Sequence, residues 1–134
     1  MRGSLPLTLL LLASCASSAV GAGAAPLTGT WRVESVAGAA AFDTTKTELV
    51  FAADGSVSTT IGCNRMAGAP KIDGDRLRFG PLATTRMACA EPLMQLETRY
   101  AAALDATRSF RVDASSLRFL DESGAEQVVF SRVR

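Results

Sequence analysis

The chain has 134 residues, with 14 Lys and Arg against 13 Asp and Glu, three cysteines and no histidine. This balanced charge, with no basic block, argues against nucleic acid as a partner. The absence of histidine removes Ser-His-Asp and Cys-His nucleophiles, the usual zinc sites and the usual general base near neutral pH. An enzyme that relies on carboxylates alone stays open, but we expect a non-enzyme with no metal and no cofactor.

Residues 1–25 are expected to be a signal peptide followed by a flexible tether. Arg2 supplies a minimal positive charge, and the apolar run from Leu5 to Ala13 follows it. At about nine residues, this run is far shorter than the roughly 20 that span a bilayer, and it has the length of a signal-peptide core. We therefore expect the domain at 26–134 to leave the cytoplasm.

Two processing routes are open for this signal. Leu12-Ala13-Ser14-Cys15 resembles a bacterial lipobox, in which the signal is cut before the cysteine and the cysteine is acylated. Small residues at Val20-Gly21-Ala22 or Ala22-Gly23-Ala24 would instead suit an ordinary signal peptidase. We favour lipidation of Cys15, because the apolar run ends beside it and its thiol otherwise lacks a partner. The expectation is a periplasm-facing lipoprotein held at a membrane, such as the outer membrane, with a soluble periplasmic or secreted protein as the alternative.

Alternation with a period of two predicts short strands through the first half of the domain. They are expected at Thr28 to Val36, Glu48 to Ala53, Ser56 to Ile61, Pro70 to Ile72 and Arg76 to Phe79. Asp54-Gly55 and Asp73-Gly74 predict tight turns between them. The opening Gly29-Thr30-Trp31 resembles the Gly-x-Trp start of lipocalins, and we expect Trp31 to plug one end of a barrel.

One helix is predicted after the last cysteine. Pro92 suits the first turn of a helix, where its missing N–H costs nothing. Apolar residues then recur at steps of three and four and form a stripe of Leu93, Leu96, Tyr100, Ala103 and Leu104. Glu97 is assigned to the other side of this helix, where it could pair with Arg86 or Arg65.

Beyond Asp105 the strand pattern resumes. Strands are expected around Phe110 and Val112, around Leu117 and Phe119, and at Gln127 to Val133, with turns at Asp113 to Ser115 and Asp121 to Gly124. About seven or eight short strands with one packed helix indicate an antiparallel α+β fold. Its sheet is expected to curve into a partial or closed β-barrel.

The two cysteines of the domain lie in Gly62-Cys63-Asn64-Arg65, followed by Gly68, and in Thr85-Arg86-Met87-Ala88-Cys89. A structural Cys63–Cys89 disulfide would close a loop of about 27 residues and add on the order of 3 kcal/mol of stability. Free neighbouring thiols and a redox or metal-binding pair are the alternatives. Gly62 and Gly68 are expected to let the backbone turn tightly around Asn64, with Arg65, Thr85, Arg86 and Glu97 completing a motif corner.

These two motifs, in this order and with Pro92 and Glu97 downstream, resemble the META domain of HslJ-type heat-shock lipoproteins. The resemblance runs from about Leu27 to the C-terminus. Ala69-Pro70 departs from it, because the family often has an aromatic residue after the glycine. The resemblance implies a small β-rich envelope protein with one helix, linked to stress or antibiotic tolerance, whose motif residues are not established catalysts.

Three function classes follow. The first is a non-catalytic exported module that binds or stabilises an unknown envelope protein through a barrel mouth or an exposed sheet edge. The second is an inhibitor of an exported protease or lysozyme, which would present the loop Gly62 to Pro70 or Gly38 to Lys46. The third is a lipocalin-like carrier of a small apolar ligand, which requires a hollow interior.

Overall fold

The computed structural model of the chain describes Gly3 and residues 25–133. The predicted lipobox and the lipidation site Cys15 lie outside these residues. Within the described part, no helix has the length and apolar character that a membrane crossing requires.

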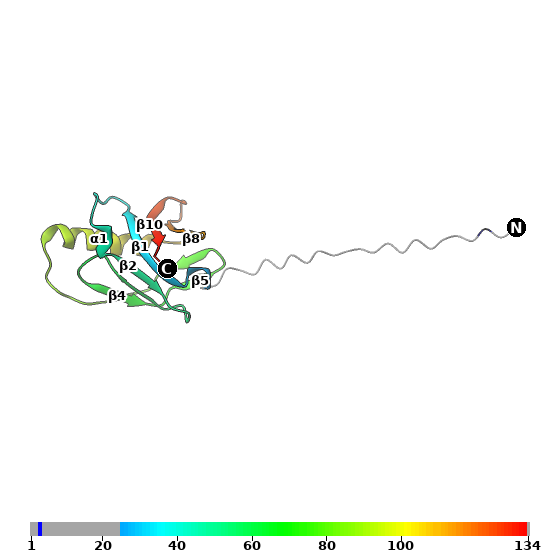
Figure 1. The fold of residues 1–134 in the computed structure, drawn as a ribbon, viewed down its shortest axis with the longest axis horizontal. Helices are drawn as coiled ribbons and strands as arrows, with labels where there is room; N and C mark the ends of the chain where they lie inside the picture. Colours follow the sequence, from blue (N-terminus) through cyan, green and yellow to red (C-terminus); the bar gives the residue numbers. More distant parts are fainter. Residues whose placement is uncertain (1–2, 4–24, 134) are drawn as a thin grey trace.

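The described residues form ten strands and one α-helix, drawn in Figure 1. Their bounds are β1 Gly29–Val36, β2 Glu48–Phe51, β3 Val57–Thr60, β4 Arg65–Gly68, β5 Lys71–Asp73, β6 Arg76–Arg78, β7 Ala83–Thr84, α1 Glu91–Ala106, β8 Ser109–Val112, β9 Ser116–Leu120 and β10 Glu126–Arg132. Two 3-10 turns, Ala25–Leu27 and Thr44–Lys46, precede β1 and β2. The predicted α+β class is confirmed, but the expected count of seven or eight strands was wrong, because β4 and β7 are too short to show alternation.

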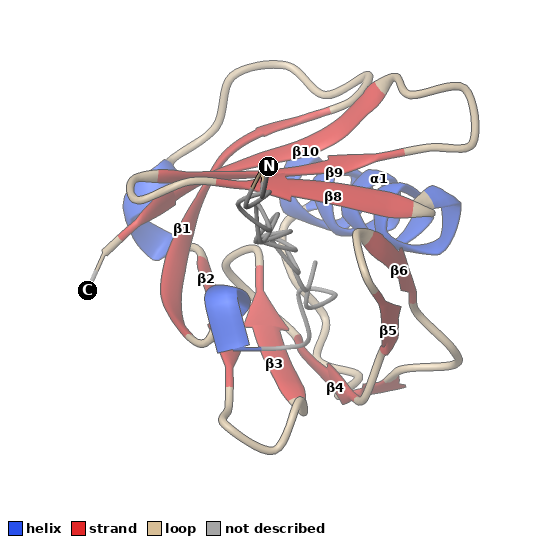
Figure 2. Cartoon of the chain, turned by 90° about the vertical axis from the view of Figure 1, so that its right-hand side faces the viewer, coloured by secondary structure: helices blue, strands red, loops and turns tan. Residues whose placement is uncertain are grey.

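All ten strands belong to one antiparallel sheet, in the order β5-β6-β8-β9-β10-β1-β2-β3-β4-β7. The segment from β4 to β7 supplies both ends of this sheet, and only residues 69 and 70 separate β4 from β5. This short link forces the two ends toward each other, so the sheet curls, as Figure 2 shows. The result is a half-barrel, because the end strands β5 and β7 do not pair with each other in the described structure.

Aspartates fix the turns that the sequence predicted. The Asp54 carboxylate accepts hydrogen bonds from the hydroxyl and N–H of Ser56, and these bonds lower its pKa. The Asp113 carboxylate accepts from the N–H groups of Ser115 and Ser116 and from the Ser116 hydroxyl, which together lower its pKa to about 2. Such local bonds let a short polar side chain take the place of a missing backbone partner.

Helix α1 begins at Glu91 with Pro92 in its first turn and ends at Ala106, in agreement with the sequence pattern. Its buried face includes Tyr100, whose hydroxyl lies 2.6 Å from the Thr59 hydroxyl. Because the Thr59 hydroxyl already donates to the carbonyl of Glu48, the tyrosine must be the donor to Thr59. Burial raises the pKa of Tyr100 far above its ordinary value, so this phenol stays neutral.

The interior of the half-barrel is filled with side chains. Its largest members are each at most 1% exposed: Trp31, Tyr100, Phe51, Phe119 and Phe130. The rings of Phe119 and Phe130 meet edge to face with centroids 4.7 Å apart, a favoured aromatic geometry. Large side chains therefore occupy the described interior, where a lipocalin-like carrier would hold its ligand.

Trp31 plugs one end of the half-barrel, as expected from its position in β1. Its indole N–H donates to the carbonyl of Leu27 at 2.9 Å. The guanidinium of Arg132, in β10, lies 4.0 Å from the centre of the indole ring. Arg132 also donates to the carbonyls of Pro26 and Thr28, so the last strand holds the segment that leads into the first.

Candidate functional site

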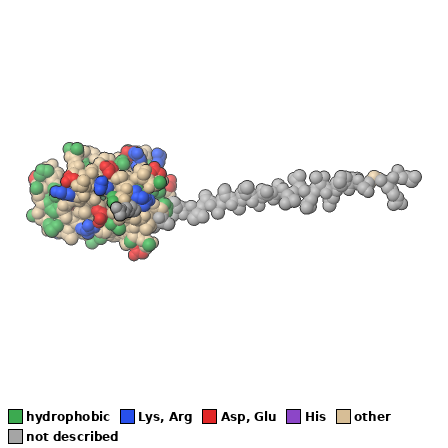
Figure 3. Space-filling model, viewed as in Figure 1, with side chains coloured by type: hydrophobic (Ala, Val, Ile, Leu, Met, Phe, Trp, Pro, Cys, Tyr) green, Lys and Arg blue, Asp and Glu red, His purple; other side chains and the backbone are tan. Residues whose placement is uncertain are grey.

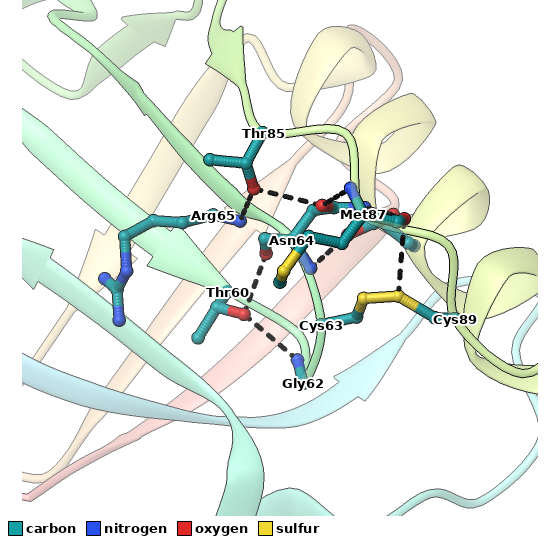
Figure 4. The surroundings of a disulfide bond; sticks show 9 residues. Thr60, Gly62, Cys63, Asn64, Arg65, Thr85, Met87 and Cys89 are labelled. Atoms are coloured by element: carbon teal, nitrogen blue, oxygen red, sulfur yellow. Dashed lines mark hydrogen bonds between the residues drawn. A yellow bond between two sulfur atoms is a disulfide. The ribbon is translucent and has the colours of Figure 1, made fainter.

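The two cysteine motifs meet at the other end of the half-barrel, beyond Thr60 at the end of β3. In the structure, the motif corner consists of Asn64, Glu97, Thr85, Met87 and the Cys63–Cys89 disulfide, and from here on the name refers to these residues. Most of them are drawn in Figure 4. Gly62 has a φ of +131°, a value that L side chains rarely adopt, and it turns the chain into the corner. Such a φ is compatible with the tight turn expected at Gly62.

Asn64 is the centre of the corner and is only 3% exposed. Its side-chain oxygen accepts hydrogen bonds from the N–H of Met87 at 2.7 Å and from the hydroxyl of Thr85 at 3.0 Å. Its side-chain nitrogen donates to the Met87 carbonyl at 3.2 Å. One buried amide therefore holds both backbone groups of Met87, much as a neighbouring strand would.

Glu97 brings α1 into the same network. Its carboxylate accepts from the backbone N–H and from the side-chain nitrogen of Asn64, both at 2.9 Å. Glu97 is 8% exposed, so the expected surface pairing with Arg86 or Arg65 was wrong. The helical spacing could have predicted that Glu97 is buried. Glu97 follows Leu93 by four residues and precedes Tyr100 by three, so it lies on the buried stripe.

The expected disulfide is present and joins Cys63 to Cys89, with their Cα atoms 6.4 Å apart. It links the end of the β3 hairpin to the residues just before α1. Both cysteines are half-buried. The bridge and the Asn64–Glu97 bonds therefore fasten the same two elements, one covalently and one by hydrogen bonds.

Arg65 lies beside the corner but does not enter it. Its side chain points away from the disulfide in Figure 4 and donates to the Ser58 hydroxyl at 2.8 Å. It also forms an ion pair of 3.4 Å with Glu48, in which both side chains are more than 40% exposed. Such an exposed pair contributes little to stability. The backbone of Arg65 joins the network through the Thr85 hydroxyl, which accepts its N–H at 3.0 Å.

Arg86 and Met87 are the residues that the corner presents to solvent. Met87 is 57% exposed, which is unusual for a large apolar side chain in the described part of the molecule. Arg86 is exposed as well, and none of residues 25–133 forms an ion pair or hydrogen bond with its guanidinium. A buried polar network thus fixes the backbone of a segment whose own side chains point outward.

The structure gives the glycine at position 68 a different role from the tight turn expected there. Gly68 lies in β4, and a Cβ atom there would come within 2.7 Å of the Leu82 side chain, so a larger residue would force that side chain to move. The expectation that Gly62 to Pro70 is a presenting loop was also wrong. Residues 65–68 form β4, which pairs with β3 on one side and β7 on the other.

A groove follows the free edge of β7 and continues past the motif corner. Two neighbouring hollows of about 460 and 510 Å³ lie here, and Thr84 lines both. They are lined by Asn64, Met66, residues 78–82 and 84–88, and one face of α1: Met94, Glu97, Ala101, Leu104 and Asp105. We call this feature the edge groove.

The polar groups of the motif corner are engaged with one another. Glu97, the buried carboxylate of the corner, already has both oxygens engaged by Asn64. The carboxyl groups whose pKa is displaced, Asp43, Asp54, Asp113 and Asp121, are exposed and all shifted downward by turn hydrogen bonds, whereas a general acid needs a raised pKa. Among residues 25–133, no three His, Cys, Asp or Glu side chains gather in a way that could hold a metal ion.

A second hollow, of about 530 Å³, lies between α1 and residues 38–42. This is the other loop expected to present residues to a partner, and Ala40 and Ala41 within it are exposed. Arg99 stands at this hollow, where a Cβ on Gly38 would approach its guanidinium to 2.9 Å. The loop is thus packed along the helix rather than projecting freely.

Comparison with known proteins places these features in a family. A model described as the META domain matches residues 25–134, which covers the whole described domain. Among curated proteins, none matches this chain.

Solved structures share the fold. An NMR structure of a protein from Burkholderia xenovorans is 27% identical, with a TM-score of 0.60 over 83% of this chain and 88% of that one. A second NMR structure is 26% identical, with a TM-score of 0.60 over 78% and 88% of the two chains. A crystal structure of a DUF4847 family protein from Bacteroides vulgatus ATCC 8482 is 17% identical, with a TM-score of 0.58 over 78% and 92%, and supports the fold alone.

Proposed function

Because the chain belongs to the META domain family, we propose that it is a non-catalytic exported envelope protein that binds or stabilises another envelope component under stress. The observation that carries this proposal is the motif corner. Its buried polar groups satisfy one another, and their combined effect is to hold Arg86 and Met87 rigidly at the surface. A rigid display of exposed side chains is what a binding surface needs.

The composition of the chain supports a binding role over catalysis. The sequence has no histidine, and within the described residues every buried side-chain nitrogen and oxygen has a hydrogen-bond partner. On the face drawn in Figure 3, basic and acidic side chains are interspersed. A mixed surface of this kind suits a protein partner better than a polyanion.

Export and anchoring are the second part of the proposal. The lipobox at Leu12-Ala13-Ser14-Cys15 supports a lipid-anchored protein that faces the periplasm. A soluble exported form, released by cleavage after Ala22 or Ala24, is the alternative product. Mass spectrometry of the mature wild type beside Cys15→Ala distinguishes the two, because only an acylated Cys15 adds lipid mass that the variant lacks.

The binding role is tested in cells. Crosslinking in intact cells, followed by purification of the tagged protein from the envelope, should recover a specific partner. A deletion strain should survive heat or antibiotic stress less well and recover with the wild type. A wild type that is soluble, unmodified and without a specific partner would count decisively against this proposal.

Inhibition of an exported hydrolase is the alternative function, and the exposed Ala40 and Ala41 in the loop beside α1 favour it over a carrier role. A surface loop held by a rigid scaffold can enter a protease or lysozyme active site. A panel of exported proteases and lysozymes should then include at least one whose rate the protein lowers. Unchanged rates across the panel would remove this alternative.

A further inference from the structure

The ten-stranded sheet ends at β7, and this strand pairs with β4 on one side only. Thr85 donates its N–H to the carbonyl of Arg65 across that ladder. Because backbone groups alternate in direction along a strand, the N–H and C=O groups of Thr84 and Arg86 point away from β4. Among the described residues, none accepts a hydrogen bond from the backbone N–H of Arg86, and Thr84 faces Met66 at a position of the ladder where its own N–H points away from β4.

The edge groove borders this free edge of the sheet, since Thr84 lines both of its halves. Its helical wall is regular, because Met94, Glu97, Ala101, Leu104 and Asp105 recur at steps of three and four on one face of α1. A free strand edge that faces a helix across a groove is an arrangement that accepts an added strand. Main-chain hydrogen bonds then give affinity, and side-chain contacts give specificity.

The charges in the half of the groove at the motif corner indicate which strand it can take, whereas Arg78 and Asp105 line the other half. At the motif corner the groove carries Arg86, an exposed guanidinium without an acidic partner among residues 25–133. The carboxylate of Glu97 lines the same half, but Asn64 engages both of its oxygens. The apolar side chains Met87 and Met94 lie beside Arg86 in this half. An acidic side chain and a neighbouring apolar one complement this arrangement.

A second copy of this chain fits less well. Pairing two β7 edges about a twofold axis would bring the two Arg86 side chains close together, with no free carboxylate in that half of the groove. Like charges that face each other across strands are destabilising. The charge of the groove therefore favours a different protein over self-association.

We propose that the edge groove binds an extended segment of a partner protein, which adds to β7 as an eleventh strand and sets an acidic side chain against Arg86 and an apolar one against Met87. This inference rests on the proposed binding function and names the surface and the kind of partner. The motif corner then has a purpose beyond stability, because Asn64 holds the backbone of Met87 in the position that an incoming strand requires.

The probe is a phage-displayed library of random peptides of about eight residues, the length of a long natural strand. Selection on the purified protein should enrich peptides that alternate apolar residues and carry Asp or Glu near one end. The best peptide should bind with its main NMR shift changes at residues 82–88 and on the α1 face that lines the groove.

Three variants separate the groove from the rest of the surface. Arg86→Glu should weaken the acidic peptide by about tenfold and shift selection toward Lys or Arg, because one rim charge is reversed. Thr84→Pro should weaken it to a similar extent, since it removes the outward N–H at a position where an edge strand tolerates proline. The matched control is Arg111→Glu, another exposed cation on a strand, which should leave the affinity unchanged. Thermal melting and NMR spectra establish that each variant is folded.

Other results would overturn the inference. These are no enrichment, peptide binding that Arg86→Glu and Thr84→Pro leave unchanged, or a dimer in solution that Thr84→Pro abolishes. The proposed function fails separately. If an envelope partner is captured equally well by the wild type and by Arg86→Glu, the proposed function stands and the groove inference is wrong. If the groove binds peptides but no envelope partner is found, the groove inference stands and the proposed function is wrong.

Discussion

At the end of the half-barrel where β1 begins, the buried indole of Trp31 lies under the guanidinium of Arg132. At the other end, the amide of Asn64 and the carboxylate of Glu97 hold each other beside a disulfide. In the register of the strands, Trp31 pairs with Leu49, and the adjacent Glu48 pairs with Thr60, which precedes the corner.

The difference shows which end mainly stabilises the fold and which mainly fixes the position of a surface segment. A large apolar side chain gains free energy by leaving water, whatever the fine details of its neighbours. A buried polar network gains little net stability, because desolvation offsets its hydrogen bonds, but it fixes a single arrangement. The indole end therefore supports the whole fold, and the motif corner specifies the position of the segment that contains Arg86 and Met87.

The largest expected effect is at the apolar end. Trp31→Ala removes the largest fully buried side chain and should lower the free energy of unfolding by about 4 kcal/mol. Denaturant titration measures this loss. Trp31→Phe, which keeps an aromatic ring, should cost clearly less. Equal losses for the two variants would contradict a packing role for the indole.

Removing the disulfide should have the next largest effect. The double variant Cys63→Ala with Cys89→Ala should lower the free energy of unfolding by about 3.5 kcal/mol, because it frees a loop closed over 26 positions. The NMR shifts of the Trp31 end should stay the same. A wild type whose stability is identical with and without a reductant would refute this estimate.

Breaking the polar network should cost about 3 kcal/mol. Asn64→Ala removes the side-chain donor to one oxygen of the buried Glu97 carboxylate and the acceptor of the Met87 N–H, while the backbone N–H at position 64 still donates to the other oxygen of Glu97. A buried charge or donor that loses a hydrogen bond is strongly unfavourable. The control is Asn64→Ala combined with Glu97→Ala, which removes both sides of the contact. The double variant should be more stable than the sum of the two single losses predicts, and strict additivity would show that the contact is weak.

A smaller loss is expected at the cation above the indole. Arg132→Met keeps the length of the side chain but loses the charge and the bonds to the carbonyls of Pro26 and Thr28. The free energy of unfolding should fall by about 1.5 kcal/mol. Arg132→Lys, which keeps the charge alone, should recover part of this, and thermal melting is sufficient to rank the three proteins.

The smallest effect is the dependence on pH. The pKa of Asp113 is lowered to about 2 in the folded protein from an ordinary 3.8. The folded state therefore binds this proton less readily than the unfolded chain, so the stabilising contribution is complete above about pH 4 and is lost as pH falls toward 2. Asp113→Asn should flatten the stability profile in that window. If the loss of stability at low pH is the same in this variant as in the wild type, other carboxyl groups control that loss.

Much of the fold was predictable because its elements are local. The hairpin turns follow from Asp54-Gly55, Asp73-Gly74 and the aspartates at 113 and 121, and the helix follows from the spacing of its apolar stripe. Strands β4 and β7 were not predictable in this way. They have four and two residues, and their places are fixed by pairing with distant partners rather than by their own pattern.

The candidate site was predictable in its members but not in its contacts. The motifs named Cys63, Asn64, Thr85, Cys89 and Glu97, and the structure brings all of them together. The partner of Glu97 was misassigned, because a carboxylate on a helix is usually exposed and pairs with an arginine. The edge groove could not be predicted from the sequence, because it depends on which strand ends the sheet. The order of strands in a sheet depends on the whole chain.

The pairing of β1 with β10 also sets the order of assembly. The first strand of the domain takes its hydrogen bonds from the last, and the Trp31 end is not covered until Arg132 arrives. Contacts between residues so far apart in the chain form slowly, because a long loop must close first. If the chain is exported as proposed, it would stay open in the translocation channel until its final residues emerge, and it would fold only after crossing the membrane.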